Sequence, residues 1–315
     1  MDIQKKRLVS TPGATYNNYM AMANGNGMII AAGKIVTNGK NAFMSISKDQ
    51  GNTWQDIDSG IPFHVYGMCY AQNDTGGLFV VVGKDGNIAY SSNGTSWKQA
   101  NIKSDGNSLT DVDYNTSLNC YCAVGVGGKI LYSTDAINWT KESTTSQAQL
   151  EGVRQTPEGF LIVGSSGAAG LYIPGSNSTT FQNIGGLNVY GCLFNPELKL
   201  YLAGGKDAIY FASTNGSNWE RHRQPPYMAY FWKIADVKGR CVTIGNADVP
   251  FPTAPYVGKQ CAFFAISENG YDYTRYYTPD GDSKPTALRA ICSDDKNIYA
   301  CGDREYLIVA NIDWS

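Results

Sequence analysis

The sequence predicts an all-β fold, a seven-bladed β-propeller with four-stranded blades. The main observation is a repeated Ser-, Asn- and Gly-rich turn that ends in an aromatic residue: Trp54, Trp97, Trp139, Phe181, Trp219, Tyr273 and Trp314. Successive members of this series lie 38 to 54 residues apart, and a period of about forty residues is typical of propeller blades. Between the turns lie short apolar runs, such as residues 28–32, 78–82 and 160–163, and no helical periodicity persists.

The two ends of the chain are expected to close the ring together. Trp314 lies one residue from the end of the sequence, so the seventh blade has no room for a fourth strand of its own. Residues 3–10 resemble the segments that follow the other aromatic residues, and we expect them to form the outer strand of blade seven, which removes an open sheet edge. The predicted single domain is 1–315, with blades at about 17–58, 64–103, 108–145, 149–185, 188–223, 228–277, and 287–315 plus 3–10.

Blades one, two, three and five carry regular copies of the turn, the first of which runs from Ser47 to Trp54 as SKDQGNTW. Blade four is degenerate because its turn lacks the leading Ser and ends in Phe181. Blade six is long, with a Pro-rich insert at 246–260 between its second and third strands that is expected to lie on the face where the inner strands begin.

In this turn, Asp or Asn followed by Gly accepts positive φ and binds nearby backbone amides, while the aromatic residue packs between neighbouring sheets. The pattern S-x-D-x-G-x-T-W resembles the Asp-box, or BNR, repeat. The resemblance implies a propeller in which these turns have a structural role. We therefore interpret six residues as structural anchors and not as ligand contacts: Asp49, Trp54, Trp97, Asp135, Trp139 and Trp219.

Composition excludes several functions. The formal net charge is −2 and only 17% of the residues are charged, with no basic stripe, so we expect no nucleic-acid partner. No apolar run is long enough for membrane insertion, and the N-terminus lacks the apolar segment of a signal peptide, which predicts synthesis in a cytoplasm. The eight cysteines fall in predicted strands and are interpreted as small buried apolar residues, so we predict neither a metal site nor a cofactor.

The candidate site is the mouth of the central channel, where one residue from each inner strand should point to the axis. The series is Met20, Tyr66, Thr110, Glu151, Tyr190, Trp232 and Arg289. Small residues mostly follow it in the sequence. Aromatic rings stack on sugars, and Glu and Arg bind hydroxyls or a carboxylate. The predicted ligand-binding residues are Tyr66, Glu151, Tyr190, Trp232 and Arg289, with Phe251 and Tyr256 of the insert. The alternative is that the series only fills the channel.

Nearby loops add His64, Arg221 and His222, and each histidine is interpreted as a solvated loop residue. Sialidases are the best-known Asp-box proteins, but their Phe-Arg-Ile-Pro motif is missing here, since no Arg precedes Ile61 and Pro62. No motif supports a carboxylate-binding triad of Arg154, Arg221 and Arg289.

Glycoside hydrolysis needs two opposed carboxylates, and the available inner pair is Glu151 with Asp111 or Asp113. No residue is assigned as catalytic.

The chain is also similar to seven-bladed assembly-factor propellers of the photosystem II type and to propellers predicted among bacteriophage tail genes. These resemblances imply a non-enzymatic binding or structural propeller, a virion tail or fibre component. It would dock on other virion proteins or recognise a host surface glycan, in an oligomeric state set by the assembly. A glycoside hydrolase of Asp-box type and a cytoplasmic assembly scaffold remain as alternatives.

Overall fold

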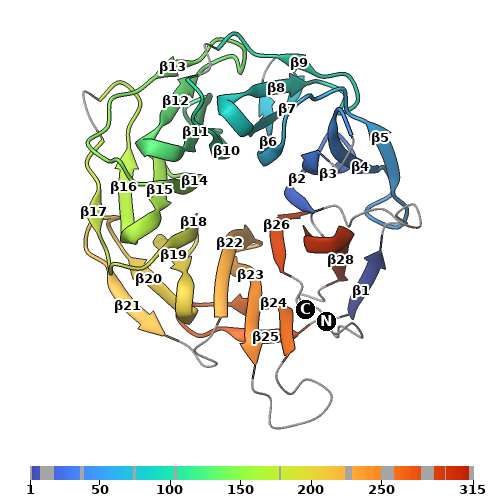
Figure 1. Cartoon of the computed structure of the whole chain (residues 1–315). Coiled ribbons are helices and arrows are strands. Elements are labelled where there is room, and N and C mark those ends of the chain that lie inside the picture. Colours follow the sequence, from blue (N-terminus) through green and yellow to red (C-terminus); the bar gives the residue numbers. More distant parts are fainter. Residues whose placement is uncertain are drawn as a thin grey trace.

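The fold is a ring of antiparallel sheets around a central axis (Figure 1). The computed structural model describes residues 2–7, 18–35, 39–73, 76–102, 105–176, 179–223, 229–249, 259–277, 287–294 and 296–311. These residues form seven four-stranded sheets, one per blade, in which the order in space follows the order in sequence except in the last. The predicted all-β seven-bladed propeller is therefore confirmed.

The first four blades follow one another without insertions. Blade one contains β2 (Tyr19–Gly25), β3 (Met28–Ile35), β4 (Ala42–Ser47) and β5 (Gln55–Asp58). Blade two contains β6 (Val65–Asn73), β7 (Gly76–Gly83), β8 (Ile88–Ser91) and β9 (Lys98–Gln99). Blade three contains β10 (Leu109–Asn115), β11 (Cys120–Gly125), β12 (Ile130–Ser133) and β13 (Thr140–Lys141). Blade four contains β14 (Leu150–Gln155), β15 (Phe160–Gly164), β16 (Ala168–Tyr172) and β17 (Gln182–Asn183).

The remaining blades include the longest strands and the closure of the ring. Blade five contains β18 (Val189–Asn195), β19 (Leu200–Gly205), β20 (Ile209–Ser213) and β21 (Glu220–Arg223). Blade six contains β22 (Ala229–Val237), β23 (Arg240–Val249), β24 (Lys259–Ser267) and β25 (Thr274–Tyr277). Blade seven contains β26 (Leu288–Ser293), β27 (Asn297–Gly302), β28 (Tyr306–Asn311) and β1 (Asp2–Arg7).

The N-terminal strand closes the ring as the sequence predicts. Strand β1 pairs antiparallel with β28, from Asp2 opposite Asn311 to Arg7 opposite Tyr306. The pairing gives blade seven its fourth strand and covers an edge that would otherwise expose unpaired backbone groups. Trp314, the seventh aromatic residue of the series, lies outside the described residues.

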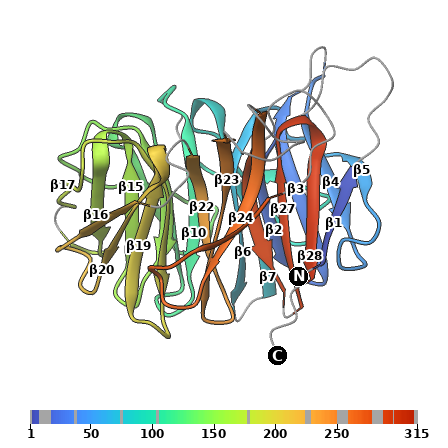
Figure 2. The same ribbon diagram turned by 90° about the horizontal axis from the view of Figure 1, so that it is seen from below.

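Two faces of the ring differ in the hairpins that they carry (Figure 2). The turns between second and third strands lie on the face where the inner strands begin, which we call the mouth face. In five blades this turn is a single 3-10 turn: η1 (Lys84–Gly86), η2 (Val126–Gly128), η3 (Ser165–Gly167), η4 (Lys206–Ala208) and η5 (Asp303–Glu305). The turns between first and second strands, and the repeated aromatic turns, lie on the opposite face.

The insert of blade six is shorter than the sequence interpretation of 246–260. Strands β23 and β24 continue to the pair Val249 and Lys259, so residues 246–249 and 259–260 extend the ladder. The long hairpin still belongs to the mouth face, but its tip, including Phe251 and Tyr256, lies outside the described residues.

The repeated turns share one hydrogen-bond pattern. In the first copy, the Oγ atom of Ser47 accepts a bond of 2.8 Å from the backbone N–H of Gly51, and Oδ1 of Asp49 accepts one of 2.8 Å from that of Thr53. Four further copies of the turn start at Ser91, Ser133, Ser213 and Ser267. In each, Oδ1 of the Asn or Asp two residues later accepts a hydrogen bond from the backbone N–H of the residue before the aromatic. Hydrogen bonds from Thr53 lower the pKa of the Asp49 carboxyl to about 2.

Each aromatic residue of these turns packs between its own blade and the preceding one. Trp97 contacts a cluster that includes Ile30 and Met44 of blade one, and Trp54 contacts one that includes Tyr299 of blade seven. The side chains are half-buried, and three indoles donate a hydrogen bond of 2.9–3.2 Å to the carbonyl three residues earlier. They seal the outer junctions between blades, while apolar residues of the first three strands of each blade form the fully buried core.

A glycine at or near the end of every second strand lies against the backbone at the start of the first strand. A Cβ atom added at any of them would lie 1.8–2.4 Å from a carbonyl oxygen, in the pairs Gly33–Asn18, Gly83–His64, Gly125–Ser108, Gly164–Gln149, Gly205–Asn188, Gly245–Tyr230 and Gly302–Ala287. In six blades the residue after the glycine donates its N–H to that same oxygen, at 2.9–3.3 Å. The contact requires glycine because of space, since the backbone at Gly125 is extended with φ −172°.

We expect Gly125→Ala to destabilise the propeller by about 1–3 kcal/mol, because the methyl group must displace the Ser108 carbonyl and its hydrogen bond. Urea unfolding followed by fluorescence measures the change. The control is Gly60→Ala, where the added Cβ meets nothing within 4 Å and only the positive φ of 64° adds strain, of about 1 kcal/mol. A cost at Gly125 no greater than at Gly60 would contradict the packing argument.

Candidate functional site

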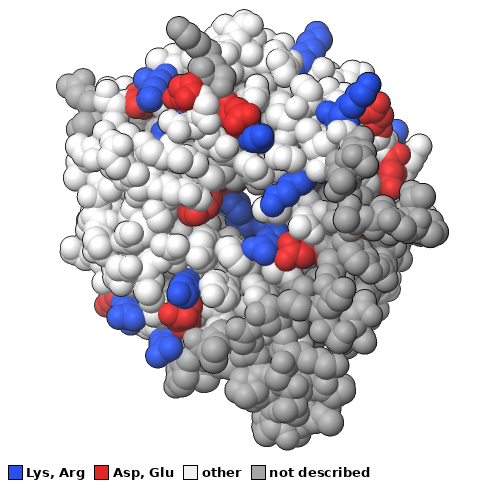
Figure 3. All heavy atoms as spheres, in the orientation of Figure 1, with Lys and Arg blue, Asp and Glu red and all other residues white. Residues whose placement is uncertain are grey.

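A β-bulge at the start of every inner strand positions the candidate site. The register of each first strand shifts by one residue against the second strand. The seven extra residues are Met20, Tyr66, Thr110, Glu151, Tyr190, Trp232 and Arg289. A bulge redirects the side chain of its extra residue, and here all seven line one pocket of about 370 Å³, which we call the mouth pocket. Charged side chains surround the central opening (Figure 3).

Five of the seven predicted ligand-binding residues therefore lie together, namely Tyr66, Glu151, Tyr190, Trp232 and Arg289. The other two, Phe251 and Tyr256, lie outside the described residues. Four lining residues lie outside the predicted inward-facing series: Ser108, Val126, Gln149 and Lys233. Ser108 and Gln149 directly precede inner strands, and that position in the repeat is the signal that identifies them.

One wall of the mouth pocket is aromatic. The rings of Tyr190 and Trp232 lie 4.5 Å apart between centroids, and Tyr230 stacks on Trp232 at 5.5 Å with an interplanar angle of 8°. The indole N–H of Trp232 donates a hydrogen bond of 2.6 Å to Oδ1 of Asn246. The wall is thus held in a fixed orientation before any ligand arrives.

Arg289 packs against this aromatic wall and is paired with Asp303. Its Nε and Nη2 atoms donate to the two carboxylate oxygens of Asp303 at 3.2 and 3.0 Å, and its Cζ atom lies 4.2 Å from the centroid of a Trp232 ring. A paired, stacked guanidinium of this kind supports the indole by a cation–π contact and is poorly placed to bind a ligand carboxylate. The remaining polar groups of the pocket are mainly hydroxyl, amide and carboxyl groups.

Glu151 is the carboxyl group of the mouth pocket. Its Oε1 atom accepts a hydrogen bond of 2.8 Å from Nε2 of Gln149. Burial raises its pKa to about 7, against the opposing effect of Lys233. At neutral pH the group therefore exists in both protonation states, and it can donate or accept a hydrogen bond.

An ion pair crosses the axis below the mouth pocket. Lys233 of blade six reaches Oδ2 of Asp111 in blade three at 2.6 Å, and Nη1 of Arg154 in blade four reaches the same atom at 2.9 Å. Burial would raise the pKa of Asp111, but the two cations outweigh it and the pKa is lowered. Asp111 and Lys233 are the two exceptions among the mostly small residues that follow the bulge, and their charges stabilise each other across the channel.

Two loop interpretations are corrected by the fold. His222 and Arg221 belong to the outer strand β21, and His222 stacks on Tyr210 with centroids 5.0 Å apart. His64 is half-buried, and its Nδ1 atom accepts a hydrogen bond of 2.8 Å from the backbone N–H of Ile35. Burial, with Lys84 and Lys34, lowers the pKa of His64. Arg154, Arg221 and Arg289 do not form a triad. Arg289 lines the mouth pocket, Arg221 lies on the outer strand β21, and Arg154 faces the opposite end of the channel.

In the part of the chain that the structure describes, no group of three or more His, Cys, Asp or Glu side chains is arranged to hold a metal ion. Within the same residues, no helix has the length and apolar character needed to cross a membrane.

No protein-family model and no curated protein sequence matches the chain. Similar solved structures include YCF48 bound to D1 peptide, with a TM-score of 0.71 and 15% identity over 99% of this chain and 95% of that one. Another is the selenomethionine-substituted virginiamycin B lyase from Staphylococcus aureus, with a TM-score of 0.75 and 11% identity over 99% of both chains. At these identities the likeness shows the fold alone.

The Glu151 carboxyl makes stability depend on pH in a defined direction. Its pKa rises from 4.5 in the unfolded chain to about 7 in the fold, so the folded state favours the protonated form. The contribution of Glu151 to the free energy of unfolding is therefore most favourable below pH 4.5, and it is lost as the pH rises to about 7. Glu151→Gln should therefore stabilise the protein relative to the native chain at pH 8 but not at pH 4, by at most about 3 kcal/mol. Urea unfolding at both values measures this, and a difference that does not change with pH would contradict it.

Proposed function

We propose that this chain is a non-enzymatic binding propeller that recognises a ligand through the mouth pocket. The observation that carries the proposal is the convergence of seven bulge residues on one concave site with a preformed aromatic wall. A site that is fixed before binding loses little conformational freedom when the ligand arrives. Most small-molecule sites are concave and largely apolar, with a few polar groups that set orientation.

A neutral, hydroxyl-rich ligand fits this pocket best. Arg289 is already paired with Asp303, and Lys233 with Asp111, so neither cation is a ready partner for an anionic ligand. Glu151, Gln149 and the Tyr66 hydroxyl offer the mixed donors and acceptors that sugar hydroxyls require. The proposed ligand is therefore a neutral sugar unit of a host surface glycan.

We place this binding activity in a virion tail or fibre component of the Asp-box type. The shared Ser and Asp or Asn hydrogen bonds of the repeated turns support the Asp-box identity. The alternative within this binding role is docking on another virion protein. One similar structure, YCF48 bound to D1 peptide, supports this alternative. In a scaffold of this second kind the mouth pocket would take a protein segment and not a sugar.

Trp232→Ala should lower glycan affinity by about tenfold or more without unfolding the ring, because it removes the stacking surface shared by Tyr190 and Tyr230. A glycan array with the purified protein identifies the ligand, and calorimetry with the best glycan measures the change. Trp219→Ala is the matched control, since Trp219 packs between blades four and five and should affect stability but not affinity. Equal affinity of the Trp232 variant and the native chain would remove the mouth pocket from consideration.

A glycoside hydrolase remains the second candidate because of one specific feature, the pKa of Glu151 near 7, which suits a general acid. Asp111 is not available as its partner, because its Oδ2 atom is bound by both Lys233 and Arg154. If glycans that bind are also cleaved, Glu151→Gln should reduce turnover by at least about a hundredfold while binding persists. Unchanged turnover in that variant would exclude Glu151 as the acid.

A further inference from the structure

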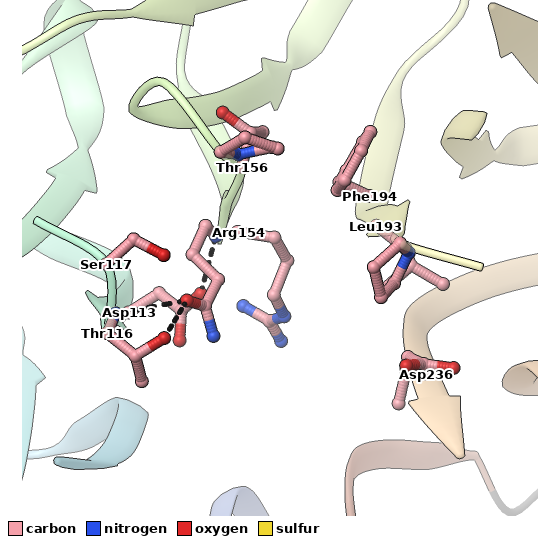
Figure 4. Close-up of a pocket in the computed structure, with 12 residues that line it drawn as sticks. Asp113, Thr116, Ser117, Arg154, Thr156, Leu193, Phe194 and Asp236 are labelled. Atoms are coloured by element: carbon pink, nitrogen blue, oxygen red, sulfur yellow. Dashed lines mark hydrogen bonds between the residues drawn. The ribbon is translucent and has the colours of Figure 1, made fainter. Parts of the chain in front are cut away.

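A second pocket of about 540 Å³ lies at the other end of the axis, on the face opposite the mouth. Figure 4 shows this pocket in close-up. Turns between the first and second strands of blades three, four and five form its rim, with the exposed residues Thr116, Ser117, Pro157 and Pro196. Its residues were not among those predicted to bind a ligand. We call it the basal pocket.

Arg154 extends from β14 into the centre of the basal pocket (Figure 4). Its Nη1 atom is used within the fold, where it donates hydrogen bonds to Oδ2 of Asp111 and to the carbonyl of Val153. The Nε and Nη2 atoms make no hydrogen bond to any residue that the structure describes, and 23% of the side chain is exposed. One edge of the guanidinium therefore presents donors to whatever enters the pocket.

Two carboxyl groups flank this donor edge. Asp113 accepts a hydrogen bond of 2.7 Å from the backbone N–H of Gln155, and Asp236 accepts one of 3.3 Å from Nδ2 of Asn195. A carboxylate has about four acceptor positions, so both groups have capacity left. Burial raises the pKa of each of them, which indicates that water solvates them incompletely.

The remaining wall is apolar. Phe194 and Leu193 come from β18, and the ring of Phe194 is held 4.7 Å from that of Tyr201 between centroids. Together with the two rim prolines they provide flat surfaces beside the charged groups. The basal pocket thus combines a donor edge, acceptors on two sides and an apolar wall.

We propose that the basal pocket is a second ligand site, which binds a neutral polyhydroxylated ring of the hexose class. Each sugar hydroxyl donates one hydrogen bond and accepts others, so it can accept from Arg154 and donate to Asp113 or Asp236. A charged ligand is less suitable because the pocket holds both signs, and either charge would meet repulsion. The apolar wall receives the C–H face of the ring.

This site is separate from the mouth pocket and does not depend on the function proposed for it. Lys233 lines the mouth pocket and Arg154 lines the basal pocket, and both bind Oδ2 of Asp111 between them. Among the described residues the two pockets share no lining residue, so a single variant can change one pocket without removing residues of the other.

The test is calorimetric titration of the whole chain with methyl α-glucoside, methyl α-galactoside and methyl α-mannoside as free rings, and with lactose and maltotriose as chain ends. We expect at least one to bind with a dissociation constant in the millimolar range, ~1–10 mM. Arg154→Lys keeps a cation beside Asp111 but removes the fork, and should weaken binding about tenfold or more. Asp236→Asn, which breaks no ion pair, should weaken it similarly. If lactose or maltotriose binds more tightly than the methyl glycosides, the natural ligand is the terminal sugar of a glycan and not a free monosaccharide.

Trp232→Ala serves as the control because it changes only the mouth pocket, and binding at the basal pocket should survive it. Thermal melting of each variant verifies that the ring remains folded. The proposal is overturned if no sugar of the panel binds at about 50 mM. It is equally overturned if binding is lost in the Trp232 variant but unchanged in both Arg154→Lys and Asp236→Asn, which would assign the sugar to the mouth pocket alone.

Discussion

The contact between a glycine of each second strand and the backbone at the start of each first strand is the constraint on which the ring depends. The glycine lets two backbones approach so closely that, in six blades, the following N–H reaches the same carbonyl oxygen. This fixes the point at which each inner strand begins and leaves one extra residue in it as a bulge. Seven repetitions produce a ring of side chains directed to one place, so that a local backbone contact determines the geometry of the mouth pocket.

The bulge also explains which parts of the site could be predicted from the sequence. Aligning the repeats was enough to identify the seven bulge residues, because each follows a buried aliphatic or aromatic residue at the same position. Strict alternation along a strand fails immediately afterwards. The neighbours Thr110 and Asp111 both face the axis, as do Trp232 and Lys233. The sequence alignment already placed Asp111 and Asp113 on the inner strand. It did not show that Asp111 pairs with Lys233 and Arg154, because these contacts join three different blades.

The blade count and ring closure were more readily predicted, because each follows from a feature repeated in every blade. An aromatic residue of each turn packs against the preceding blade, so its spacing reports the size of one blade. The hydrogen bonds of the turn are local and involve residues two to four apart. By contrast, the glycine contact joins residues 15 to 19 apart and depends on space, which composition does not reveal.

The pairing of β1 with β28 has a consequence for how the protein is made. The first strand of the chain has no partner until almost the whole sequence has been synthesised, since Asp2 pairs with Asn311. Closing so long a loop costs entropy that the earlier blades do not incur, because their hairpins are local. The blades can form one after another on the ribosome, but the ring becomes complete only after β28 has been made. Until then β28 presents an exposed edge, and chaperone binding would be most useful at that stage.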